Sequence, residues 1–73
     1  MNYERGKVAI AAQAATYARR VKAGEINASA VEGLLEADAD RFGDSGIARS
    51  GIFAHGLDHY DRLVAQPGEV NER

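Results

Sequence analysis

The sequence predicts an all-α fold, a small three-helix bundle built on an antiparallel helical hairpin. Bulky residues recur at helical spacing in three segments of the chain, and glycine or proline follows each segment. No segment alternates hydrophobic with polar residues or concentrates β-branched ones, so we expect no strand. A chain of 73 residues has room for one domain, which we place at residues 1–68, with a flexible tail at residues 69–73.

The first helix is expected at about residues 3–23. Its predicted inward residues follow steps of four, three and four along one helical face: Ile10, Ala14, Tyr17 and Val21. Arginine and lysine are frequent in its last turn, where positive charge is favourable because it complements the helix dipole. Gly24 is a typical terminator, because glycine readily adopts the left-handed conformation that closes a helix.

The second helix is expected at about residues 28–42, after a connection so short that this helix becomes an antiparallel neighbour of the first. Asn27 can cap its first turn, and Ser29 offers a competing start two residues later. Asp38 falls where the next inward residue should be, so the hydrophobic face weakens there. The predicted inward residues are Val31, Leu34, Leu35 and Phe42.

The third helix is expected at about residues 47–65 and ends before Pro67. Within it a glycine precedes a bulky residue every five residues, in the strings GIARS, GIFAH and GLDHY. These glycines either allow another helix to pack closely or mark a loosely formed turn at residues 44–51. The predicted inward residues are Phe53, Leu57, Tyr60 and Val64.

The composition indicates a thin hydrophobic core. Fourteen of the hydrophobic residues are alanine, which favours helix but buries little surface. The chain has no cysteine, so disulfides cannot compensate, and we expect self-association as a homodimer instead. No signal-peptide pattern or membrane-length apolar run is present, so we expect a cytoplasmic protein that does not enter the membrane.

The residue types argue against an enzyme and against a bound cofactor. The chain has no cysteine nucleophile, and its serines occupy expected capping or surface positions without an evident base. Glu32 and Glu36 lie one helical turn apart, which is typical of a solvated acidic face rather than of a catalytic carboxylate pair. The glycine-rich residues 43–46 lack the lysine and spacing of a phosphate-binding loop.

Charge is distributed unevenly along the chain and suggests a protein partner. Residues 1–22 carry a net charge of +4 and residues 23–48 a net charge of −5. A helix lined with carboxylates can occupy a basic groove of a larger protein, although an ordinary solvated surface has the same pattern. The acidic residues in question are Glu25, Glu32, Glu36, Asp38, Asp40 and Asp44.

The third helix offers a second candidate contact surface for a partner, formed by Phe53, His55, His59 and Tyr60. We therefore expect a protein-binding module, an inhibitor or adaptor that occludes a larger protein. Small inhibitors that phages and mobile elements direct against host machinery have a similar size and composition.

Two alternatives remain open from the sequence. The first is binding of a nucleic acid or nucleotide through the basic end of the first helix, with Tyr17, Arg19, Arg20 and Lys22 as the contact residues. The second is a metal site at His55 and His59, which are four residues apart and so share a helical face. A third metal ligand is not evident, and a pair of partly exposed, hydrogen-bonded histidines is the simpler interpretation.

Overall fold

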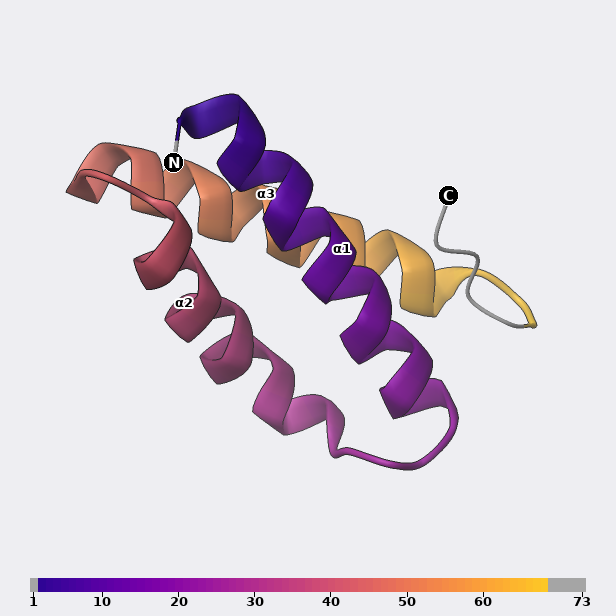
Figure 1. Cartoon of the computed structure of the whole chain (residues 1–73). Helices are drawn as coiled ribbons and strands as arrows, with labels where there is room; N and C mark the ends of the chain where they lie inside the picture. Colours follow the sequence, from indigo (N-terminus) through magenta and orange to yellow (C-terminus); the bar gives the residue numbers. More distant parts are fainter. Residues whose placement is uncertain (1, 69–73) are drawn as a thin grey trace.

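The computed structural model describes residues 2–68 and confirms the predicted all-α three-helix bundle (Figure 1). Its helices are α1 (Tyr3–Lys22), α2 (Val31–Phe42) and α3 (Gly46–Ala65), and a short 3-10 turn, η1 (Ala28–Ala30), leads into α2. No strand occurs between residues 2 and 68. None of the three helices is both long and apolar enough to cross a membrane, within the part of the chain that the structure describes.

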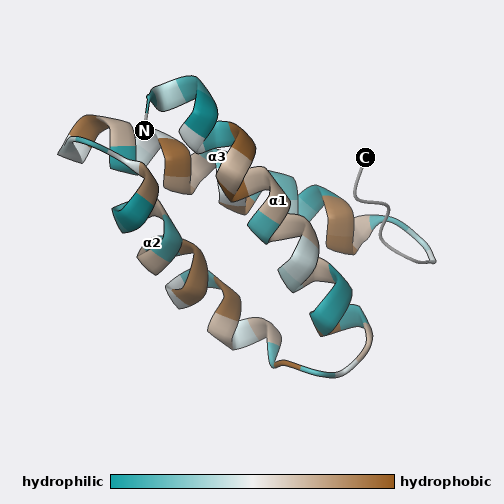
Figure 2. Ribbon diagram, in the orientation of Figure 1, coloured by the Kyte–Doolittle hydropathy of each residue, from teal (hydrophilic) through white to brown (hydrophobic). Residues whose placement is uncertain are grey.

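Helix α1 contacts both of the other helices (Figure 1). It runs antiparallel to α2, to which it is joined by a short loop, and it crosses α3, with which it has its most extensive contact. Figure 2 shows hydrophobic segments on all three helices, separated by hydrophilic ones. The buried hydrophobic core contains Ile10, Ala14, Ala15, Tyr17, Ala18, Val31, Leu35, Ala39, Ile52, Tyr60 and Leu63.

Side-chain caps fix the starts of α1, η1 and α3. The Asn2 side chain accepts a hydrogen bond from the backbone N–H of Arg5, and Ser45 accepts one from Ala48 in the same way. Asn27 caps η1 by accepting from the N–H of Ser29 at 3.1 Å, as predicted. Gly24 closes α1 with a φ of +75°, a conformation that side-chain-bearing residues rarely adopt.

Two of the predicted inward faces are displaced in the structure. Leu34 is 39% exposed, because α2 meets α1 and α3 on one side only and Leu34 lies at the edge of that contact. The most buried line of α3 passes through Ile52 and Gly56 to Tyr60, whereas Phe53 packs partly buried at its border, as do Leu57 and Val64. The prediction placed the centre of this face on the bulkiest residues, but the glycine is what allows α1 to approach.

Glycine permits the close crossing of α1 and α3. A Cβ atom added to Gly56 would lie 2.5 Å from Cγ1 of Ile10, and one added to Gly51 would lie 2.5 Å from the hydroxyl of Tyr3. Gly46, by contrast, has open space around it at the first position of α3. Close packing therefore explains two of the three repeated glycines, and residues 46–51 are helical rather than loosely formed.

We predict that Gly56→Ala destabilises the fold by about 1–3 kcal/mol, because the new methyl group overlaps the fully buried Ile10. Gly33 is the matched control, since it is exposed in α2 with nothing near its would-be Cβ. Gly33→Ala should stabilise the fold by up to about 1 kcal/mol through helix propensity. Urea unfolding measures both changes, and equal effects at the two positions would contradict the close crossing.

Candidate functional site

The exposed carboxylates of α2 form a straight row. Glu32, Glu36 and Asp40 are spaced four residues apart, so they follow one another along a single helical face, and all three are exposed. We call these three residues the acidic row. Glu25 and Asp44 are also exposed, in the segments before and after the helix.

Asp38 does not belong to this surface, so its inclusion in the predicted acidic face was wrong. Only 6% of the residue is exposed. The Tyr17 hydroxyl donates a hydrogen bond of 2.5 Å to the Asp38 carboxylate, and Gln13 donates to both residues at 3.2 Å. Arg41 approaches the other carboxylate oxygen at 3.8 Å. Asp38 therefore joins α2 to α1 through its polar partners.

Helical spacing explains why a carboxylate is found there. Val31, Leu35 and Asp38 follow steps of four and three on the inward face of α2, so the Asp38 side chain must enter the contact with α1. A buried carboxylate is tolerated when hydrogen-bond donors satisfy it, and Tyr17 and Gln13 supply them. Burial, followed by the hydrogen bond to Asp38, raises the pKa of Tyr17 to about 12.

The basic end of α1 does not present the predicted phosphate-binding set. Tyr17 is 8% exposed and its hydroxyl is held by Asp38, so its ring cannot stack on a base at the surface. Lys22 donates hydrogen bonds to the backbone oxygens of Gln66 and Gly68, which ties the end of α1 to the segment after α3. Arg20 is exposed and Arg19 is partly buried.

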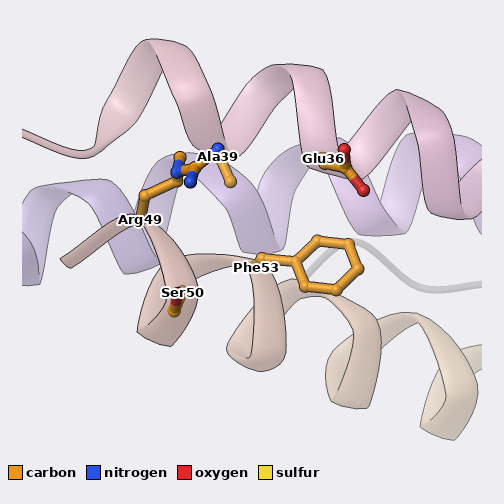
Figure 3. A pocket seen from close by; sticks show the side chains of 5 residues that line it. All are labelled: Glu36, Ala39, Arg49, Ser50 and Phe53. Atoms are coloured by element: carbon orange, nitrogen blue, oxygen red, sulfur yellow. The ribbon is translucent and has the colours of Figure 1, made fainter. Parts of the chain in front are cut away.

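A pocket of about 240 Å³ opens between α2 and α3, beside the acidic row (Figure 3). Figure 3 shows the Phe53 ring of α3 below the Glu36 side chain of α2, while Arg49 extends from α3 towards α2. Arg49 pairs with Asp40 at 2.6 Å, and this hydrogen bond raises the pKa of Arg49. We call this cavity the α2–α3 pocket, and its lining residues are Glu36, Ala39, Arg49, Ser50 and Phe53.

The four residues predicted as a contact surface on α3 do not lie together. Phe53 lines the α2–α3 pocket, whereas His55 and His59 line a different groove against α1. Tyr60 is 7% exposed and belongs to the core, so its prediction as a contact residue was wrong. Its position four residues after Gly56 places it on the buried face of the helix.

The groove between α1 and α3 has a volume of about 540 Å³, and we call it the α1–α3 groove. The two imidazole rings lie nearly parallel in it, with centroids 6.4 Å apart and planes inclined by 7°. Asp58, between them in the sequence, pairs with Arg62 at 3.2 Å. The lining residues are Glu4, Lys7, Val8, Ala11, Ala12, His55 and His59.

Residues 2–68 contain no group of three or more histidine, aspartate or glutamate side chains placed to hold one metal ion. The histidines are therefore a pair of donors without a third protein ligand from the described part of this chain.

Several lining residues were missed at the level of sequence. Arg49 and Ser50 reach the α2–α3 pocket only because the turn at residues 43–45 folds α3 back towards α2. The position of Val8 in the sequence could have indicated the α1–α3 groove, because Val8 is a bulky residue off the inward face of its helix. In the structure it is 73% exposed and lines this groove.

Comparisons of this chain with protein-family models, with curated proteins and with solved structures find no match.

We predict that Tyr17→Phe destabilises the fold by about 1–3 kcal/mol, because the buried Asp38 carboxylate loses its shortest hydrogen bond. The control is Tyr3→Phe, since Tyr3 is 45% exposed and its change should be within about 0.5 kcal/mol. Urea unfolding at neutral pH provides the comparison. Similar stabilities for the two variants would mean that Tyr17 contributes no more than a surface hydroxyl.

The raised pKa of Tyr17 also predicts a loss of stability in alkali. Its pKa is about 12 in the folded protein, whereas a tyrosine in the unfolded chain titrates near 10. As pH rises through this window, the unfolded state loses the proton first, so the free energy of unfolding decreases. The decrease should be smaller in Tyr17→Phe by on the order of 1–2 kcal/mol. Part of the loss should persist in this variant, because burial also raises the pKa of Tyr60.

Proposed function

We propose that this chain is a small non-enzymatic protein-binding module that holds a basic segment of a larger protein against α2 and α3. The acidic row and the adjoining α2–α3 pocket form the contact surface, and the module acts as an inhibitor or an adaptor. The observation that carries the proposal is the alignment of three exposed carboxylates beside a pocket that contains an aromatic ring.

The charges of the acidic row are largely available to a partner. Asp40 is paired with Arg49, but Glu32 and Glu36 have no ion pair within the described chain. At 1.5 Å per residue, the row extends about 12 Å along the helix axis. Lysine or arginine side chains at matching intervals would complement it, and the shared negative field would speed their approach.

The α2–α3 pocket adds an anchoring point to this charged surface. Phe53 is partly buried and faces the cavity together with the carboxylate of Glu36. A long basic side chain can lay its aliphatic stem against the ring and place its charged head at the carboxylate. Such combinations of an aromatic contact and an ionic contact are typical of the residues that dominate binding energy in protein interfaces.

The composition of the pocket argues for binding rather than catalysis. Its hydroxyl group belongs to Ser50, whereas the two histidines of the chain line the α1–α3 groove. The lining of the pocket thus offers no imidazole base for its hydroxyl. Arg49 forms an exposed ion pair with Asp40 in the wall of the pocket.

The test is affinity capture with the full chain as bait, in the wild type and in a variant with Glu32→Gln and Glu36→Gln. A protein retained by the wild type at low salt should bind the variant about tenfold more weakly, which corresponds to about 1.4 kcal/mol. Its retention by the wild type should also decrease as salt is added, because the contacts are exposed charges.

The matched control carries Glu4→Gln and Asp61→Asn, which change the net charge equally at exposed positions outside the acidic row. This control should retain the partner as the wild type does. An equal loss of partner binding in both variants would mean that only the net charge matters, which would contradict the proposed surface. Retention of labelled nucleic acid, with no protein bound, would favour the basic end of α1 instead.

A further inference from the structure

His55 and His59 are placed to act on one ligand together. They lie one helical turn apart on α3, and their rings are parallel with centroids 6.4 Å apart. His55 is exposed and His59 is partly exposed, so both rings can rotate about their side-chain bonds without moving the backbone. Both belong to the wall of the α1–α3 groove, which is separate from the contact surface proposed above.

Two neutral imidazoles at this spacing form a chelate for a transition-metal ion. Metal–nitrogen bonds of about 2.0–2.1 Å bring the two donor nitrogens to about 3 Å from each other, and a modest rotation of two surface side chains achieves this. Imidazole prefers zinc, nickel and copper, whereas magnesium and calcium prefer oxygen ligands. The chemistry of the donors therefore selects the class of ion.

The surroundings of the pair leave room for an ion and contain little opposing charge. The side chains of Ala11 and Ala12 in the groove wall are small. Lys7 is the cation of the groove, and it pairs with Glu4 at 2.8 Å, which reduces its repulsion of a second cation. Asp58 pairs with Arg62 and does not form a group of three metal donors with the two histidines.

We propose that His55 and His59 chelate one divalent transition-metal ion of the zinc, nickel and copper class in the α1–α3 groove. The two imidazoles supply two of its ligands, and water completes its coordination, because no third histidine or carboxylate of the described chain reaches the pair. The bound ion links two successive turns of α3 and so stabilises the folded state. This site does not depend on the proposed protein partner.

The test uses the full chain and measures its thermal unfolding with ZnCl₂ or NiCl₂ in excess. The midpoint should rise by about 5 °C or more once the metal exceeds its dissociation constant about tenfold. MgCl₂ should leave the midpoint unchanged. In parallel, the imidazole C–H resonances of both histidines should shift together as ZnCl₂ is added, which reports ligation independently of stability.

The controls exploit the fact that the chain has two histidines and no cysteine. His55→Gln and His59→Gln should each abolish the shift of the midpoint, because one imidazole cannot chelate. A rearranged variant with His59→Asp and Asp61→His keeps composition and charge but places the imidazoles six residues apart, on different faces of α3. It should also lose the response.

Circular dichroism of each variant without metal establishes that it is folded, which is expected because residues 55, 59 and 61 lie at least partly at the surface. A wild type that shows no rise of the midpoint with either metal would overturn the site. So would a full response that survives in a single-histidine variant or in the rearranged one, since carboxylates would then be the ligands.

Discussion

Where α1 crosses α3, a glycine on one helix faces a large side chain on the other. Ile10 of α1 lies against Gly56 of α3, and Ile52 of α3 lies against Gly6 of α1. The short distance between the helices suits an alanine-rich sequence, because the small side chain of alanine is fully buried only when a neighbouring helix approaches its backbone. Ala14 and Ala18 are both completely buried in α1.

The position of α2 follows from the same crossing. Helix α3 contacts α1, and α2 packs along the side of α1 that carries Tyr17, with its buried residues on one face. Its inward line has a carboxylate, Asp38, which accepts hydrogen bonds from Gln13 and Tyr17 within the fold. Its outward line keeps Glu32 and Glu36 in water. One short helix thus separates a structural carboxylate from those available for recognition.

The parts of this fold that were predictable from the sequence are those decided within a few residues. Gly24 and Asn27 mark the turn between the first two helices through local backbone and side-chain chemistry. In the structure Gly24 adopts the left-handed conformation and Asn27 acts as a cap, as predicted. The pairing of Tyr17 with Asp38 spans 21 residues and depends on how two helices are rotated against each other, which no local pattern specifies. Helical spacing had placed Asp38 on the inward face of its helix, whereas its charge led to its assignment to the acidic surface, and the spacing was the correct guide because Asp38 is buried.

The division of α3 into two surfaces bears on both proposals. Phe53 and His55 are two residues apart, which places them about 160° apart around a helix. Phe53 therefore faces α2, while His55 faces the groove beside α1. A substitution tests a binding role separately from stability when the side chain is exposed and its removal leaves the hydrophobic core intact. Glu32 and Glu36 on one surface and His55 on the other satisfy this condition, since none of them contributes to the hydrophobic core. The proposed binding of a protein and the proposed binding of a metal ion can therefore be tested separately, by substitutions outside the hydrophobic core.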